Sequence, residues 1–197
     1  MSFAFLRDLR DLSVVVLHPH NAEGEFLVDH LRRIGCKATQ LWPIPEMLPL
    51  GTDVVFLAVE HEARLDIERF VERMPEPAPT MIAIVGYENP STLQIVLESG
   101  ALAVVERPIK PFGLLTNLAI ARKVWLDRQS RIKDARKYRR RALGDQRVAR
   151  AKAILMVQES CTEDAAYQLL RQQSMVRRVA IEEVAQSVID SEKTARA

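Results

Sequence analysis

The stretch DVVFLAVE (53–60) holds six consecutive apolar residues, three of them valines, between Asp53 and Glu60. A continuous apolar run of this length is typical of a strand buried on both faces of a parallel sheet. Four similar runs surround it along the chain. Five such runs within about 110 residues predict a flavodoxin-like, doubly wound α/β domain over residues 1–112. The other four are SVVVLHP (13–19), ATQLW (38–42), MIAIVGY (81–87) and ALAVVE (101–106).

Segments with apolar residues at helical spacing separate these runs. Helices are predicted around residues 26–34, 63–74 and 91–99, and Gly35 and Gly100 stand where the first and the last of them should end. Strands alternating with helices of this length indicate a sheet covered on both faces.

The chain changes character after Pro111. From residue 112 to about 152 it has no proline, so one long helix is expected. Its apolar residues recur on alternating three- and four-residue steps, as in a coiled-coil seam, and we assign residues 113–145 to a dimerisation helix. Arg128 and Arg139 interrupt the seam, and a helix folded back on its own domain is the alternative. The seam residues are Leu114, Leu118, Ala121, Trp125, Ile132, Ala135 and Ala142.

The formal net charge of +2 conceals an uneven distribution of charge along the chain. Residues 1–112 hold 10 basic and 16 acidic side chains, whereas residues 122–152 hold 13 basic and 3 acidic ones. A concentrated basic stretch beside an acidic domain indicates an element that binds a polyanion. A solvated helix face without a ligand is the alternative interpretation.

The last fifty residues divide into three helical patterns, over 147–159, 162–178 and 180–193. Thr162 precedes two acidic residues and an apolar run, which is a helix N-cap signal. Helices this short bury little surface alone, so a three-helix domain over 146–193 is predicted. In the middle helix a buried stripe is expected at Ala166, Leu169 and Leu170.

The residues of this segment resemble the ANTAR domain, a family that binds RNA in transcription antitermination regulators. The resemblance covers about fifty residues, and Ser174 and Cys161 depart from the usual family pattern. The stretches RIGC (33–36) and LWPIPE (41–46) extend a resemblance to antitermination regulators of amidase operons over the whole chain. The motifs of the ANTAR segment are RVARAKAILM (147–156), TEDAAYQLLR (162–171), SM (174–175) and IEEVA (181–185).

Five residues of this segment are candidates for contact with RNA. Tyr167 and Arg171 are four residues apart on the middle helix, so their flat side chains could stack against unpaired loop bases. A core position is the alternative for Tyr167. Lys152 matches a lysine of the family, with a structural role as the alternative, and Arg147 and Arg150 beside it are expected to contact phosphates.

The α/β half resembles a response-regulator receiver that lacks the residues needed for phosphorylation. A receiver needs carboxylates after its first strand to hold Mg²⁺ and an aspartate at the end of its third strand to accept phosphate. The resemblance places other residues at all of these positions, which implies a pseudo-receiver that cannot be phosphorylated. They are His18 and Pro19 after the first strand, Ala58 after the third, Val85 after the fourth and Arg107 after the fifth.

Together the resemblances imply a transcription antitermination regulator that binds stem-loops in nascent leader RNA and has no enzymatic activity or cofactor. A ligand-sensing protein that sequesters the regulator is the implied means of control. A DNA-binding response regulator is the alternative function, although it would need a recognition helix with exposed base-reading residues. A protein-interaction scaffold and an enzyme rank below it, and no catalytic or metal-ligand motif supports the latter.

The remaining features bear on where the protein resides. Cys36 and Cys161 have no disulfide or metal-ligand spacing, no apolar run is long enough to span a bilayer, and the acidic residues of the amino-terminal segment make it a poor signal peptide. A homodimer in a reducing cytoplasm, away from membranes, is therefore expected.

Overall fold

The computed structural model describes residues 9–87 and 89–196, except for the side chains of His61 and of residues 194–196. Most of the amino-terminal segment interpreted above lies outside the described residues. The chain divides into two compact units, Met1–Gln129 and Ser130–Ala197, which we call the first and the second unit. The boundary falls within one long helix.

The first unit contains a five-stranded sheet whose neighbouring strands are all parallel. The strand order β2-β1-β3-β4-β5 is that of a doubly wound, flavodoxin-like domain. The predicted fold class is thereby confirmed, and each strand begins within two residues of its predicted run. The strands are β1 (Ser13–Leu17), β2 (Lys37–Leu41), β3 (Val54–Ala58), β4 (Thr80–Val85) and β5 (Ala103–Glu106).

The predicted helices of the first unit are also confirmed. The Asn21 side chain accepts a hydrogen bond from the Gly24 N–H and so caps the first described helix. Gly35 ends that helix with φ of 106°, a conformation that glycine adopts without strain. The helices are α2 (Ala22–Ile34), the 3₁₀ turn η1 (His61–Ala63), α3 (Arg64–Glu72), α4 (Pro90–Glu98) and α5 (Leu114–Gln158), which continues into the second unit.

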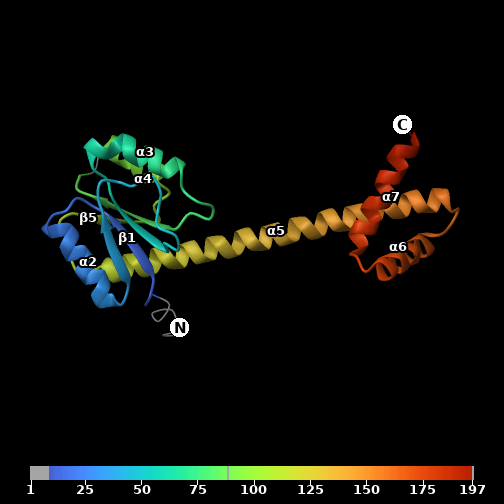
Figure 1. The fold of residues 1–197 in the computed structure, drawn as a ribbon, viewed down its shortest axis with the longest axis horizontal. Coiled ribbons are helices and arrows are strands. Elements are labelled where there is room, and N and C mark those ends of the chain that lie inside the picture. The colour runs from blue at the N-terminus through green and yellow to red at the C-terminus, as the bar shows by residue number, and fades with distance from the viewer. Residues whose placement is uncertain (1–8, 88, 197) are drawn as a thin grey trace. The chain divides into compact units, whose positions relative to one another are not determined.

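Helices cover both faces of the sheet (Figure 1). Alternate residues of each strand point to opposite faces, so that Val14 and Phe56 pack towards α2 and α5, whereas Val15 and Leu57 pack towards α3 and α4. This double burial is the reason why the central strands β1, β3 and β4 are almost continuous apolar runs, whereas the edge strands β2 and β5 are partly exposed.

The first turns of α5 pack against their own unit, which corrects part of the predicted dimer seam. Leu114, Leu118 and Ala121 are at most 1% exposed and lie in one cluster with Val105 and Ile109. Side chains buried this deeply in one chain cannot also contact a partner helix. For these three residues the alternative of a helix folded back on its own domain is the right one.

Arg122 and Trp125 fix the next turn of α5 to the same unit. Trp125 Nε1 donates a hydrogen bond to the Ala78 carbonyl at 2.7 Å, and an Arg122 guanidinium nitrogen lies 3.1 Å from Asp53 Oδ1. The Arg122 guanidinium also lies 4.5 Å from the centre of the Trp125 ring, in cation–π geometry. Trp125 therefore also packs within its own unit; it is half-exposed, so its contact in the predicted seam stays a prediction.

The two cysteines differ sharply in their surroundings. Cys36 is buried, and burial raises the pKa of its thiol to about 11, whereas Cys161 is half-exposed. Because the thiolate is the reactive form, we expect Cys161 of the native protein to react with iodoacetamide at pH 8 and Cys36 to remain unmodified until the protein is unfolded. Peptide mass mapping after timed alkylation would measure this. Equal labelling of both thiols would contradict the burial of Cys36.

The second unit consists of the end of α5 with α6 (Glu163–Arg177) and α7 (Ile181–Arg196). The Thr162 hydroxyl accepts a hydrogen bond from the Ala165 N–H at 3.3 Å, which confirms the predicted N-cap. Gly144 does not interrupt α5, so the first helix of this unit is the final part of a 45-residue helix and does not start afresh at residue 146. The buried residues of the unit are Ala151, Ile154, Leu170, Val184, Ala185 and Ile189, with Ala166 buried nearby.

One residue of the predicted stripe in α6 lies elsewhere. Ala166 and Leu170 are buried as expected, but Leu169 is 37% exposed. Residues 166 and 170 are four apart and share one face of the helix, whereas residue 169 is rotated away from it. The face that α6 buries is therefore narrower than predicted.

Candidate functional site

The pseudo-receiver positions gather at the carboxyl ends of the strands of the first unit. Ala58 ends β3 and Val85 ends β4, and both are buried and apolar. His18, directly after β1, is fully buried. Its Nδ1 lies 2.9 Å from the Pro19 carbonyl oxygen and its Nε2 lies 2.9 Å from an Arg107 nitrogen. Nε2 also lies 3.4 Å from Glu23 Oε2.

Arg107 connects four segments around this position. One guanidinium nitrogen lies 2.6 Å from Glu60 Oε1, and Nε lies 3.2 Å from Glu23 Oε2 without hydrogen-bond geometry. Glu23 in turn accepts a hydrogen bond from the Ile109 N–H at 3.0 Å. The space where a receiver would hold a cation and a phosphoryl group thus contains a guanidinium cation paired with carboxylates. Among the described residues, no group of three or more His, Cys, Asp or Glu could hold a metal ion.

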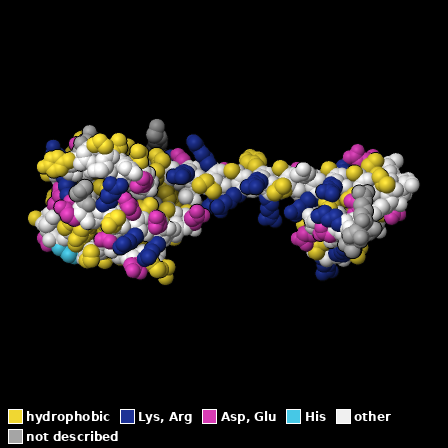
Figure 2. All heavy atoms as spheres, turned by 90° about the horizontal axis from the view of Figure 1, so that it is seen from above, with side chains coloured by type: hydrophobic (Ala, Val, Ile, Leu, Met, Phe, Trp, Pro, Cys, Tyr) yellow, Lys and Arg dark blue, Asp and Glu magenta, His cyan; other side chains and the backbone are white. Residues whose placement is uncertain are grey.

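The basic side chains of the chain gather along α5 (Figure 2). Of the predicted RNA contacts on this helix, Arg147 and Arg150 are exposed. Neither forms an ion pair with a carboxylate of the residues that the structure describes. Unneutralised arginines on an exposed surface can bind an external anion without first losing an internal partner.

Tyr167 and Arg171 lie on the solvent side of α6. Tyr167 is 41% exposed and Arg171 is exposed, so the tyrosine does not occupy the core position that was its alternative. Their four-residue spacing makes the two side chains neighbours on the helix surface. The pair offers an aromatic ring and a guanidinium group, both of which present flat faces to an unstacked base.

Lys152 differs from the other predicted RNA contacts. Its ammonium group forms a hydrogen-bonded ion pair with Glu163 at the start of α6, and its side chain is only 21% exposed. The Lys152 hydrogen bond and charge hold the pKa of the Glu163 carboxyl below its usual value. The pair ties the end of α5 to α6, which supports the structural role that was the alternative for this lysine.

The prediction from sequence missed a further group of basic residues. Arg136, Lys137 and Arg140 line a groove between α5 and the start of α7, together with Arg147, which was predicted. The signal was present in the run RKYRRR (136–141), where six consecutive positions hold five basic residues and one tyrosine. The sequence showed the charge of this run but not the second wall of the groove, because that wall is supplied by residues more than thirty positions away.

Comparison with known proteins assigns both halves of the chain. Residues 12–122 match the family described as "AmiR, N-terminal", and residues 136–189 match the ANTAR domain. The chain is also 31% identical to the "Aliphatic amidase regulator" of Pseudomonas aeruginosa over 192 residues, which cover 98% of each protein. The chain belongs to the AmiR family of ANTAR-domain regulators. The resemblance noted from the sequence motifs is thereby confirmed.

Solved structures similar to this AmiR-family chain match its first unit. A response regulator receiver protein from Burkholderia phymatum has 18% identity and a TM-score of 0.46, and covers 57% of this chain and 96% of its own. A CheY-like protein from Pseudomonas aeruginosa has 17% identity and a TM-score of 0.45, and covers 55% of this chain and 96% of its own. No helix among the described residues is long and apolar enough to cross a membrane.

The arrangement around Ala58 predicts that this AmiR-family protein does not accept phosphate. Acyl phosphate formation needs a carboxylate at this position, and a methyl group stands there instead. After incubation with acetyl phosphate and Mg²⁺, we expect the intact mass to remain that of the unmodified chain. An authentic receiver treated in parallel would verify the reagent. A mass gain of one phosphoryl group, mapped to any aspartate of the first unit, would contradict the assignment of the pseudo-receiver positions.

Proposed function

We propose that this protein is a transcription antitermination regulator that binds stem-loops in nascent leader RNA. The observation that carries the proposal is the exposed Tyr167–Arg171 pair beside unpaired arginines, within the unit that matches the ANTAR domain. Stacking surfaces next to a cationic surface suit RNA loops, whose bases are unpaired and whose phosphates are close together. A bound stem-loop would prevent the competing terminator hairpin from forming.

The five protein residues proposed to act on the RNA have different roles. Tyr167 and Arg171 stack against loop bases, while Arg147 and Arg150 neutralise phosphates. Lys152 acts on the RNA through its pair with Glu163, which holds the first turn of α6 against α5. Its replacement should therefore alter the position of Tyr167 more than it alters the number of phosphate contacts.

Control of this activity is assigned to a protein partner. Without a phosphate acceptor at Ala58, the first unit would not be controlled by phosphorylation. A ligand-sensing protein that sequesters the regulator would supply the signal instead. We further propose a homodimer, in which two ANTAR units could hold two loops at once and raise the effective concentration of the second contact. Of the predicted seam, four residues remain for this role: Trp125 and Ile132 are half-exposed, and Ala135 and Ala142 are exposed.

A gel-shift comparison at stated salt concentrations tests the proposal against the DNA-binding alternative. The full-length protein is titrated into a stem-loop RNA, a duplex RNA of the same stem and a duplex DNA of equal length. We expect the stem-loop RNA to bind most tightly and its affinity to fall steeply with salt, because cationic contacts release counterions from the phosphates. Preferential binding of duplex DNA would favour a DNA-binding regulator, and binding of none of the three would overturn both.

A further inference from the structure

The second unit contains a groove of which the residue assignments above include only Arg147. It has a volume of about 670 Å³ and lies between residues 136–147 of α5 on one side and Ala180, Glu182 and Glu183 at the start of α7 on the other. We infer that this groove binds the sugar–phosphate backbone of a double-stranded RNA stem. The inference rests on the proposed function and adds a second contact to it, separate from the loop contact at Tyr167.

The floor of the groove is formed where α7 meets the backbone of α5. Gly144 is buried, and a Cβ atom at this position would lie 2.9 Å from Glu182 Cγ. A side chain at this position would require the Glu182 side chain to move, so glycine lets Glu182 lie against the backbone of α5. The two walls of the groove meet at this contact.

The basic residues of the groove have no ion-pair partners among the residues that the structure describes. Six of the lining residues are arginine or lysine and two are glutamate, yet none of the six forms an ion pair or side-chain hydrogen bond with the residues that the structure describes. Like charges held close together repel one another, so an external polyanion would relieve the repulsion. The six are Arg136, Lys137, Arg139, Arg140, Arg141 and Arg147.

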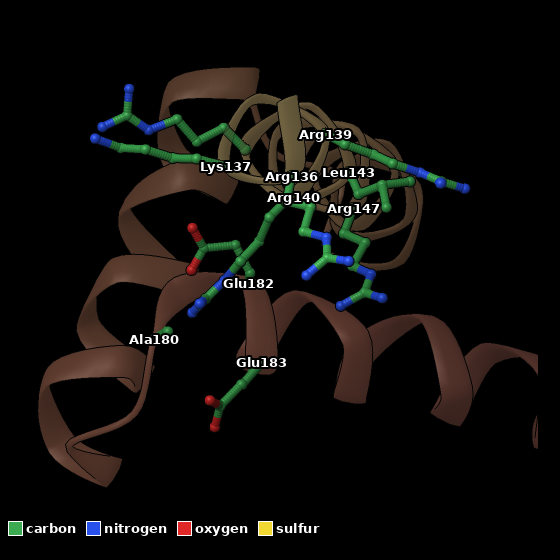
Figure 3. A pocket seen from close by; sticks show the side chains of 11 residues that line it. Arg136, Lys137, Arg139, Arg140, Leu143, Arg147, Ala180, Glu182 and Glu183 are labelled. Atoms are coloured by element: carbon green, nitrogen blue, oxygen red, sulfur yellow. The ribbon is translucent and has the colours of Figure 1, made fainter. Parts of the chain in front are cut away.

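The directions of the side chains define a line of arginines along α5. In Figure 3, Arg136, Arg140 and Arg147 extend to the same side of the helix, while Lys137 and Arg139 point to opposite sides. From residue 136 to residue 147 the helix rises about 16 Å at roughly 1.5 Å per residue. This length is enough to follow several consecutive phosphates of one strand of a stem.

The side chains that line the groove favour contact with the sugar–phosphate backbone of RNA over contact with its bases. Guanidinium groups bind phosphate oxygens in a bidentate manner, whereas no aromatic side chain lines the groove to stack against an unpaired base. The carboxylates of Glu182 and Glu183 on the opposite wall repel phosphates and would keep the strand along α5. A straight line of arginines suits a stem, whose backbone is regular and is recognised by shape rather than by sequence.

The test compares a groove variant with a matched control on the same helix. Arg136→Gln/Arg140→Gln removes two groove charges, and Arg131→Gln/Lys133→Gln removes two charges from exposed positions of α5 outside the groove. Each full-length variant, checked for folding by circular dichroism, is titrated with stem-loop RNAs that share one stem and differ in loop sequence. We expect the groove variant to lose roughly ten- to fiftyfold in affinity at ~0.1 M salt, equally for all loops, with a salt slope shallower by about one to two units.

The outcomes separate this inference from the proposed function. If the parent protein binds no stem-loop RNA, the proposed function fails and the inference fails with it. If the parent binds but the groove variant keeps the affinity and the salt slope of the control variant, only the inference is overturned. A loss that depends on the loop sequence would also overturn it, because backbone contacts carry no sequence information.

Discussion

Replacing Leu118 with alanine should destabilise the first unit by about 2–5 kcal/mol, the usual cost of truncating a fully buried leucine. Leu118 is 0% exposed and packs in the cluster between the sheet and the first turns of α5. The lost contacts and the cavity left behind both act within one chain. The loss is therefore expected at any protein concentration, unlike that from a residue in a dimer interface.

Hydrogen exchange of the strand amides in the full-length protein would measure this loss for the first unit by itself, since local opening energies are resolved along the chain. Ile132→Ala is the matched control, because it truncates a residue of the same predicted seam that is only half-buried. We expect faster exchange in β1, β3 and β4 of the Leu118 variant and little change in the control. If Leu118→Ala left exchange unchanged but shifted a dimer towards monomer, Leu118 would belong to the seam after all.

Replacing Tyr167 with alanine should weaken the binding of open-loop RNA hairpins by about 1–3 kcal/mol, the usual contribution of one stacked base. The ring is 41% exposed on the face of α6 that also carries Arg171. Its loss removes the stacking surface but no charge, so the salt dependence of binding should stay that of the parent. Isothermal titration or gel shifts over a range of salt concentrations would measure both quantities.

Tyr167→Phe provides the control for this variant. Phenylalanine keeps the aromatic face and removes only the hydroxyl, so it should bind nearly as well as the parent if the ring stacks on a base. Circular dichroism must show that Tyr167→Ala is folded, because the buried neighbours Ala166 and Leu170 hold α6 in place. A folded alanine variant with parental affinity would exclude the stacking role and leave the arginines of α5 as the RNA site.

The elements that could be predicted from the sequence are those set by local patterns. The central strands are continuous apolar runs because both faces of the sheet are covered. Thr162 and Gly35 mark helix ends through contacts within four residues of themselves. Which surface buries the apolar face of α5 could not be predicted in this way. Three- and four-residue spacing at Leu114, Leu118 and Ala121 produces one apolar helix face, and a sheet buries such a face as well as a second helix does.

In the candidate site, too, the sequence predicts local features but not contacts between helices. Exposure of Tyr167 and Arg171 follows from the helical period, since Ala166 and Leu170 take the buried face. In contrast, the pairing of Lys152 with Glu163 joins two helices across a turn, and the groove depends on the start of α7 meeting Gly144. Neither contact has a signature in the spacing of residues, because each is set by the packing of the three helices.

The methyl group of Ala58 has a consequence for the timing of the response. A receiver that forms an acyl phosphate keeps a covalent memory of its signal, which lasts until the bond is hydrolysed. A protein with alanine at this position, and with an Arg107–Glu60 ion pair at the same end of the sheet, would have no such memory. If a sequestering partner controls it, the active fraction follows mass action: the stoichiometry of the two proteins sets its level, and the rates of association and dissociation set how quickly the response starts and stops.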